Sequence, residues 1–225
     1  MKIFIYDFDG TITSNPMVQY NILKKCKITP QKMQKKVFKY MKDNNTNMYY
    51  GYYNIFFELL KKNNIEINID NICYKASSIE LNEGVVDYFK RYKDEKHYVV
   101  TSGFKDFIYK TEVGKYLTNV YGVQVDYENK DNHIKKIITD LDKIDAIKKI
   151  IKVNKCQEKD IIYFGDGPTD KYAFSYVHSI GGKCVLIKNK KNSKMTNNKA
   201  IDYVFEPDYS INSQIDEFVK EQINN

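Results

Sequence analysis

The chain opens with a short apolar run that ends in two aspartates. Ile3 to Tyr6 has the pattern of a buried strand, and Asp7 and Asp9 follow it. Side chains two residues apart on extended backbone point to the same side, so the two carboxylates lie together. Gly10 and Thr11 then break the strand, which places the acids at its carboxyl end, where open α/β sheets bind ligands. This opening favours an α/β fold with a site at that edge.

The two aspartates also indicate a chemistry. Neighbouring carboxylates repel each other unless a cation neutralises them or one keeps its proton. A hard cation such as Mg²⁺ with a phosphate ligand relieves that repulsion. Asp7 can then attack phosphorus while Asp9 handles the proton of the leaving group. The alternative is a strand followed by an Asx-type turn with solvated acids, and the motif alone does not decide between the two.

Composition narrows the class of protein. With 225 residues, of which 42% are hydrophobic, the chain has enough apolar surface for a buried core. Its apolar runs are shorter than the roughly 18 to 20 residues of a membrane span. The N-terminus starts directly with a strand pattern and lacks the features of a signal peptide, so we expect a cytoplasmic protein without a membrane partner.

Cysteines and charge carry little functional information. The four cysteines and three histidines are scattered, so free thiols are expected rather than a zinc site or a disulfide. The net charge of +7 comes from lysines spread along the whole chain among 29 acids, and no nucleic-acid-binding module accompanies them. We therefore expect a small-molecule substrate and no nucleic-acid partner. The stretch from Lys188 to Lys199, rich in Lys and Asn, is interpreted as a solvated loop.

Residues 14–81 differ in character from the rest. Apolar residues recur there at helical spacing, and Thr29-Pro30 has the form of a helix N-cap followed by proline in the first turn. We expect helices at Pro16 to Lys27, Thr29 to Lys42 and Tyr52 to Lys62, a short one at Ile69 to Ser77, and no clear strand. This pattern predicts a small helical cap subdomain over 14–81, inserted into a core formed by 1–13 and 82–225.

Strand and helix patterns alternate in the rest of the chain. This alternation predicts a Rossmann-like parallel sheet flanked by helices on both faces. An edge hairpin is expected where Asn119 to Tyr127 meets Ile134 to Ile137. The further expected strands are His97 to Val100, Asp160 to Phe164, Lys183 to Ile187 and Tyr203 to Phe205, and the further expected helices are Glu83 to Tyr92, Phe104 to Lys110, Leu141 to Val153, Tyr172 to Ser179 and Ile211 to Gln222.

A second acidic turn follows a later strand. Gly165-Asp166-Gly167-Pro168-Thr169-Asp170 places Asp166 where it can share a cation with Asp7, because the ends of parallel strands meet at one edge. Asp170, four residues on, is either a further ligand or an orienting group. The plainer interpretation is a glycine-rich turn with an aspartate at the helix N-cap.

Two more features complete the predicted site. Thr101-Ser102-Gly103 offers hydroxyl and N–H donors at the expected start of a helix, which is an anion site or an ordinary helix cap. Transfer of a phosphoryl group also requires a fixed cation. Lys143, at the start of the helix that leads to Asp166, is the candidate. The lysines that compete with it are Lys135, Lys136, Lys148 and Lys149.

Taken in order, these motifs resemble those of the haloacid dehalogenase superfamily. The resemblance covers nearly the whole chain and rests on Asp7-Phe8-Asp9-Gly10-Thr11, the strand that ends at Thr101, Lys143, and Gly165 to Asp170. It implies that Asp7 is a nucleophile that forms an aspartyl-phosphate and that Asp9 is the general acid and base. It further implies a Mg²⁺ cofactor. The metal-binding residues that we expect are Asp7, Asp9 (through its backbone carbonyl), Asp166 and Asp170, and the phosphate-binding residues are Gly10, Thr11, Thr101, Ser102, Gly103 and Lys143.

The helical segment between the first two motifs is similar to the cap of the branch that includes phosphoserine phosphatase. That branch usually has a glutamate soon after the first motif, whereas Ile12-Thr13-Ser14-Asn15 contains no acid. The resemblance therefore does not extend to recognition of an amino-acid substrate. Six aromatic residues of the cap either line the substrate cavity or form the core of the cap: Tyr49, Tyr50, Tyr52, Tyr53, Phe56 and Phe57.

The leading hypothesis is a Mg²⁺-dependent hydrolase of a small phosphomonoester. Two alternatives stay open: a phosphomutase or phosphotransferase that uses the same aspartates, and a catalytically silent binding module on the same fold. A dehalogenase is disfavoured because that chemistry needs neither the metal nor an acid at Asp9. The sequence contains no indication of the substrate's identity or of the oligomeric state.

Overall fold

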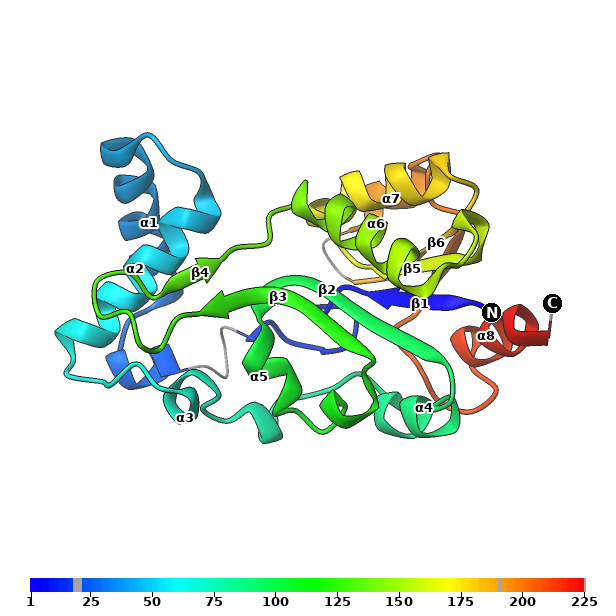
Figure 1. Cartoon of the computed structure of the whole chain (residues 1–225), viewed down its shortest axis with the longest axis horizontal. Helices are drawn as coiled ribbons and strands as arrows, with labels where there is room; N and C mark the ends of the chain where they lie inside the picture. Colours follow the sequence, from blue (N-terminus) through cyan, green and yellow to red (C-terminus); the bar gives the residue numbers. More distant parts are fainter. Residues whose placement is uncertain (18–21, 190–191, 225) are drawn as a thin grey trace.

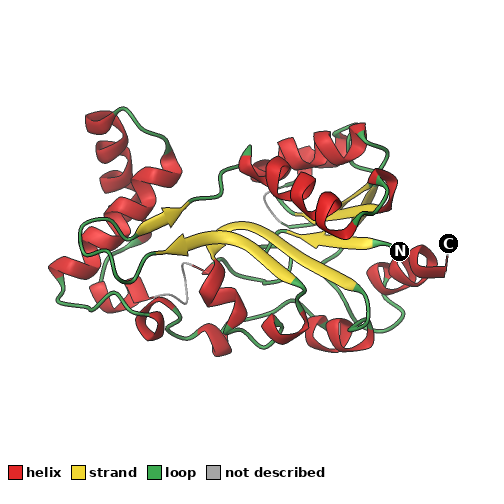
Figure 2. Ribbon diagram, in the orientation of Figure 1, coloured by secondary structure: helices red, strands yellow, loops and turns green. Residues whose placement is uncertain are grey.

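The computed structural model describes residues 1–17, 22–189 and 192–224, and it shows a sheet with helices on both faces (Figures 1 and 2). The strands are β1 (Ile3–Tyr6), β2 (Lys96–Phe104), β3 (Asn119–Val125), β4 (Ile134–Lys136), β5 (Ile161–Gly165), β6 (Lys183–Ile187) and β7 (Tyr203–Phe205). The α-helices are α1 (Pro30–Asn44), α2 (Met48–Lys62), α3 (Ile69–Ile72), α4 (Val85–Arg91), α5 (Lys105–Tyr109), α6 (Asp142–Asn154), α7 (Lys171–Ser179) and α8 (Gln214–Asn224).

The seven strands form one sheet in the order β4-β3-β2-β1-β5-β6-β7. Neighbouring strands are parallel except for β3 and β4, which are antiparallel, as predicted for the edge hairpin. The central strand β1 pairs with β2 on one side and with β5 on the other, so Ile3 lies opposite both Lys96 and Ile161. The predicted Rossmann-like α/β fold is confirmed, and its three central strands end at the same edge.

Alternate residues of β1 face opposite sides of the sheet. Ile3 and Ile5 belong to a core cluster with residues of α6 and α7, while Phe4 and Tyr6 pack with residues of α4, α5 and α8. In the view of Figure 1, α6 and α7 lie above the sheet and α4 and α5 below it. All four residues of β1 are therefore buried, which explains its uninterrupted apolar pattern.

Helices form residues 14–81, called here the helical insertion, and no strand occurs in its described residues 14–17 and 22–81. Helix α1 begins as predicted, because the Thr29 hydroxyl accepts a hydrogen bond from the N–H of Lys32 at 3.2 Å. Helix α2 begins four residues earlier than predicted, since Asn47 caps it. Of the helix expected at 16–27, residues 18–21 lie outside the described residues and Ile22–Cys26 is a 3₁₀-helix.

The two ends of the insertion meet at a single β-bridge between Thr13 and Leu81. Helix α2 packs on the end of β2, where Phe104 lies with its ring centroid 5.1 Å from that of Tyr53 and 5.0 Å from that of Phe56. One continuous apolar cluster therefore runs from the insertion into the face of the sheet. The division into a core of 1–13 and 82–225 and a cap of 14–81 stays a prediction.

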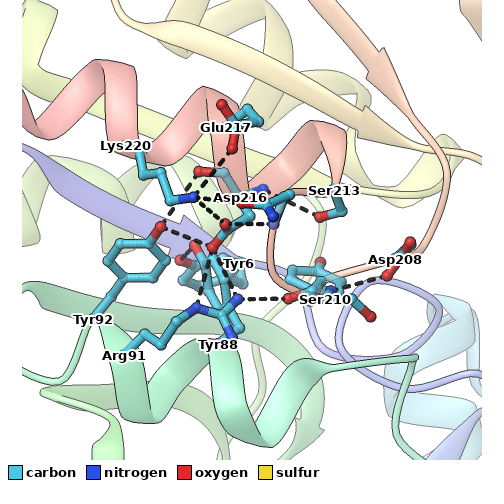
Figure 3. A network of polar contacts seen from close by, with 12 residues as sticks. Tyr6, Tyr88, Arg91, Tyr92, Asp208, Ser210, Ser213, Asp216, Glu217 and Lys220 are labelled. Carbon is cyan, nitrogen blue, oxygen red and sulfur yellow. Dashed lines mark hydrogen bonds and ion pairs between the residues drawn. The ribbon is translucent and has the colours of Figure 1, made fainter.

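The C-terminal helix is anchored by a network of polar contacts (Figure 3). Asp216 of α8 is fully buried and accepts hydrogen bonds from Arg91, at 2.8 Å, and from the Tyr92 hydroxyl, also at 2.8 Å. Lys220 lies 2.8 Å from its other oxygen. Burial would raise the pKa of Asp216, but these donors and the N–H of Asn212 together hold it well below its usual range. This charged network fixes α8 to α4.

A buried histidine continues the polar contacts beneath this network. The Nε2 atom of His97 lies 2.7 Å from the carbonyl oxygen of Tyr92, so it carries the proton and donates. Its Nδ1 atom therefore accepts from the Tyr6 hydroxyl, at 3.2 Å. His97 is fully buried, and burial lowers its pKa from the ordinary 6.5 to about 4. The imidazole is thus neutral in the folded protein throughout the mildly acidic range.

This depressed pKa predicts a pH dependence of stability. Between about pH 6.5 and pH 4 the unfolded chain takes up a proton at His97 that the folded chain does not. Stability therefore falls as the pH falls through that window, by up to about 3 kcal/mol. Urea unfolding at pH 7 and pH 4.5 will show a smaller loss in His97→Gln than in the wild type. The exposed His178→Gln is the control and retains the wild-type loss. An equal loss in wild type and His97→Gln contradicts the prediction.

Candidate active site

A cavity of about 360 Å³ opens at the carboxyl ends of the three central strands. Asp7 and Asp9 line it from the turn after β1, Thr101 lines it from β2, and Asp166 lines it from the turn after β5. Three segments that are far apart in sequence thus meet at one edge of the sheet. This convergence follows from the parallel order of β2, β1 and β5.

Lys143 lies in the first turn of α6 and is buried beneath the cavity. Its ammonium group is 3.0 Å from an oxygen of Asp7 and 2.7 Å from an oxygen of Asp170. Burial alone would lower the pKa of Lys143, but the two carboxylates raise it above its ordinary value, so the side chain stays charged. The competing lysines are all exposed: Lys135, Lys136, Lys148 and Lys149.

Asp170 acts in the structure as an orienting group. One of its oxygens accepts from Lys143, at 2.7 Å, and from the Tyr163 hydroxyl, at 2.6 Å. The other accepts from the N–H groups of Asp166 and Gly167, each at 3.1 Å. Both oxygens are already engaged by the chain itself. Of the two predicted roles for Asp170, this geometry favours positioning of Lys143 over direct metal ligation.

Asp166 lies against the turn after β1. Gly10 has φ +81°, and a Cβ atom at this position would lie 2.2 Å from the Asp166 carboxylate. Only glycine allows this approach. The Asn189 amide donates to the Asp166 carboxylate, at 2.6 Å, and the Asn192 amide donates to the Asp166 carbonyl oxygen, at 2.7 Å. Asp166 is therefore held from both sides.

The cavity carboxylates are short of positive charge. Burial raises the pKa of Asp7 to about 6, with Lys143 opposing the shift, and raises that of Asp9 to about 7. Burial, together with the charges of Asp7 and Asp170, raises the pKa of Asp166 to about 8. These raised pKa values indicate that Lys143 alone does not neutralise the negative charge of the cavity carboxylates.

Three of these acids offer ligand oxygens to one point. Single oxygen atoms of Asp7, Asp166 and Asp170 lie within 4.8 Å of one another, a separation that suits a shared cation. The Asp9 carboxylate does not belong to this cluster, and one of its oxygens accepts from the N–H of Met17 at 2.7 Å. The residues present thus fit a hard cation, with Asp7 and Asp166 as the carboxylate ligands whose oxygens are least engaged.

The prediction that Thr101-Ser102-Gly103 lies at the start of a helix is wrong, whereas its role as an anion site stays a prediction. Thr101, Ser102 and Gly103 belong to β2, which continues to Phe104 because Phe104 pairs with Val123 after a bulge. All three still line the cavity. The Thr101 hydroxyl accepts from the N–H of Gly103 at 3.2 Å, whereas the buried Ser102 hydroxyl has no hydrogen-bond partner within the described residues.

Gly10 and Thr11 do not line the cavity. Thr11 is fully buried, and its carbonyl oxygen accepts from Asn82 and from the Tyr209 hydroxyl. The N–H of Gly10 donates to the Thr13 hydroxyl, at 3.4 Å. Their predicted contacts with phosphate have no support from this arrangement, and both residues instead shape the turn that carries Asp7 and Asp9.

The aromatic residues of α2 divide between the two roles considered for them. Tyr49, Tyr52 and Tyr53 line the cavity. Phe56 and Phe57 are buried in the core, and Tyr50 is 45% exposed.

The residues of the site region that were not predicted from the sequence include Tyr163, Asn189, Asn192, Met17, Met48 and Phe104. Asn189 and Asn192 lie in the stretch interpreted as a solvated loop. That interpretation is wrong for Asn192, which is only 3% exposed. Their amide groups were the available signal, because amides that follow a strand end are good partners for a carboxylate.

Known structures share this architecture. The sequence matches no protein-family model and no curated protein sequence. A phosphoserine phosphatase in its apo form superposes with a TM-score of 0.64 at 18% identity, covering 97% of this chain and 98% of its own. A phospho-aspartyl intermediate analogue of phosphoserine phosphatase gives a TM-score of 0.61 at 19% identity, with 98% of both chains covered. A HAD family hydrolase from Salmonella enterica subsp. enterica serovar Typhi gives a TM-score of 0.68 at 14% identity, covering 94% of this chain and 72% of its own.

Within the described residues, no helix has both the length and the apolar character to cross a membrane. The similarity to the two phosphoserine phosphatase structures covers 97% and 98% of this chain, at identities that establish the fold alone. The chain therefore has the fold of haloacid dehalogenase superfamily hydrolases, in the form found in phosphoserine phosphatase.

Proposed function

We propose that this protein hydrolyses a small phosphomonoester with the help of Mg²⁺, through an aspartyl-phosphate on Asp7. The observation that carries the proposal is the position of Asp7, which lines the cavity while Lys143 lies 3.0 Å from one of its oxygens. A carboxylate beside a buried ammonium group, with further acids within reach of a cation, suits attack on phosphorus.

In the proposed reaction, an oxygen of Asp7 attacks phosphorus and the bond from phosphorus to the leaving oxygen breaks. Asp9 gives its proton to that oxygen as the alcohol departs. Asp9 then accepts a proton from water as the water oxygen attacks phosphorus, which breaks the bond to Asp7 and releases phosphate. The pKa of about 7 at Asp9 supports this role, because both protonation states are populated near neutral pH.

The remaining groups bind the transferring phosphoryl group. Lys143 compensates charge on its oxygens, and Asp170 and Tyr163 hold Lys143 in place. Thr101 and the unpartnered hydroxyl of Ser102 are the donors on the β2 side. Mg²⁺, held by Asp7, Asp166 and the backbone carbonyl of Asp9, would supply further neutralisation of phosphoryl charge when bound.

The test is release of phosphate from a panel of small phosphomonoesters, with Mg²⁺ and with EDTA. Metal-dependent release supports the proposal. Phosphate that reappears on an added alcohol, rather than in solution, instead supports the phosphotransferase alternative. Absence of turnover across the panel favours the silent module.

Asp166→Ala tests the metal site separately. Loss of this carboxylate removes one of the two carboxylate ligands proposed for the cation, so the Mg²⁺ concentration for half-maximal activity is expected to rise at least about 10-fold. Titration of activity against Mg²⁺ measures it, with the exposed Asp208→Ala as the matched control. An unchanged Mg²⁺ requirement in Asp166→Ala excludes this residue as a ligand.

A further inference from the structure

The catalytic cavity has two unlike sides. The acids and Thr101 lie on the side of the sheet edge. The apolar part of the lining, called here the aromatic wall, consists of ring and thioether side chains from the helical insertion and the end of β2: Met17, Met48, Tyr49, Tyr52, Tyr53 and Phe104. Because the acids and this wall line the same cavity, we expect the alcohol part of a substrate whose phosphoryl group lies near Asp7 to contact the wall.

Two of the three tyrosines of the wall, Tyr49 and Tyr53, have hydroxyls with an identified acceptor. Tyr49 donates its hydroxyl to Asp140, and Tyr53 donates its hydroxyl to the carbonyl oxygen of Ser102. Burial raises the pKa of both hydroxyls, which keeps them neutral. Since Asp140 and Ser102 hold these two polar tips, the surface that Tyr49 and Tyr53 leave for a ligand is mainly that of their rings.

Ring contacts hold the wall in place. The ring centroid of Tyr53 lies 5.1 Å from that of Tyr52 and 5.1 Å from that of Phe104, in both cases edge to face. These separations fall within the range that aromatic pairs prefer. An aromatic ring that enters the cavity would contact ring edges and faces that are already fixed. Binding would therefore cost little conformational entropy in these protein side chains.

The apolar surface continues beyond the cavity. Met48 and Tyr52 also line a second cavity of about 580 Å³, whose other walls are mostly apolar. These include Leu23, Ile28, Met33, Val37 and Phe38. The polar residues of this second cavity are Lys24, Thr29 and Gln34. A charged group held against the aromatic wall itself would give up water and meet rings in its place.

We propose that the substrate is the phosphomonoester of an uncharged alcohol that carries an aromatic ring. This inference rests on the proposed function and specifies its substrate class. The described residues that line the catalytic cavity include no lysine or arginine. The wall thus matches a ring better than it matches the ammonium and carboxylate groups of an amino acid.

A matched pair of substrates tests the inference. Benzyl phosphate and 4-carboxybenzyl phosphate share the ester and the ring and differ by one carboxylate. We expect kcat/KM for benzyl phosphate to be about 100-fold higher, since the wall offers the carboxylate no cation. Acetyl phosphate, a small activated phosphoryl donor, reports on the phosphoryl chemistry independently of the ring.

Two arginine variants of α2 sharpen the test. Met48 is 50% exposed and lines the cavity, so Met48→Arg places a cation on the wall at little risk to folding. Met48→Arg is expected to reduce the preference for benzyl phosphate over 4-carboxybenzyl phosphate at least about 10-fold, because the new cation favours binding of the carboxylate-bearing substrate. Tyr50→Arg adds the same charge to the same helix at a 45% exposed position outside the cavity lining, and is expected to leave the preference unchanged.

The outcomes separate the two proposals. If acetyl phosphate is hydrolysed but the enzyme turns over 4-carboxybenzyl phosphate or O-phosphoserine as well as benzyl phosphate, the inference is overturned while the phosphatase proposal stands. If Met48→Arg and Tyr50→Arg change the substrate preference equally, the inference is also overturned. The added charge would then act at a distance and not by contact with a substrate at the aromatic wall. If neither acetyl phosphate nor any of the three esters is hydrolysed with Mg²⁺, both proposals fail.

Discussion

Asp7→Asn is expected to abolish phosphate release while leaving the protein folded. The amide has nearly the shape of the carboxylate but is not a nucleophile towards phosphorus, so turnover should fall at least about 10⁴-fold. Asp7 is the residue that lines the cavity and also pairs with Lys143 at 3.0 Å. The measurement is phosphate release from the best substrate of the panel at saturating Mg²⁺.

The stability of Asp7→Asn gives an independent readout. The pKa of Asp7 is raised to about 6 in the folded protein, mainly by burial, against an ordinary value of 3.8. A raised carboxyl pKa means that ionisation opposes folding as the pH rises through that interval. Asp7→Asn also removes one of the two acids that pair with Lys143, which keeps Asp170 at 2.7 Å. These two effects oppose each other, so in EDTA at pH 7 Asp7→Asn should melt close to the wild-type temperature.

A matched variant controls for a general effect of charge. Asp131→Asn removes one negative charge at an exposed position and should keep both turnover and melting temperature. Turnover of Asp7→Asn within 10-fold of the wild type would refute the nucleophile assignment. A large fall in its melting temperature would instead show that Asp7 is needed for the fold, and Asp7→Glu then tests the chemistry with the charge retained.

The sequence predicts the part of the site that lies at the ends of the central strands. Asp7 and Asp166 each follow an apolar run, and parallel strands bring their ends to one edge, so proximity follows from the pattern alone. Lys143 was identified by its position at the start of a predicted helix. Its burial could not be predicted, because the sequence contains 35 other basic residues. The burial of the charged Lys143 side chain is explained by its ion pairs with Asp7 and Asp170.

The other parts of the site depend on contacts between distant segments. Thr101 to Gly103 are turn-forming residues, and only pairing of Phe104 with Val123 extends the strand past them. The amides of Asn189 and Asn192 look like those of any polar loop until Asp166 lies beside them. Helical spacing places Tyr49, Tyr52 and Tyr53 on one face of α2, but docking of that helix on Phe104 decides that the face meets the cavity.

Lys143→Met is expected to lower turnover about 10³-fold. The methionine fills a similar volume but removes the cation that compensates phosphoryl charge and pairs with Asp7. It also leaves Asp170, a fully buried acid, without its 2.7 Å ion pair. Removing one partner of a buried pair destabilises by about 3 to 5 kcal/mol, so the variant should also melt at a lower temperature.

The pH dependence separates the loss of catalysis from the loss of folding. With Lys143 gone, the remaining carboxylates raise one another's pKa, and the fold regains stability when they are protonated. The penalty of Lys143→Met should therefore shrink as the pH is lowered from 8 to 5, measured by urea unfolding in EDTA, while turnover at pH 5 stays low. Lys152→Met, at an exposed position of the same helix, should match the wild type in both measurements. Turnover of Lys143→Met within 10-fold of the wild type would contradict the catalytic role of this lysine. Lys143 would then serve only to hold Asp7 and Asp170 in place, and other groups would compensate the phosphoryl charge.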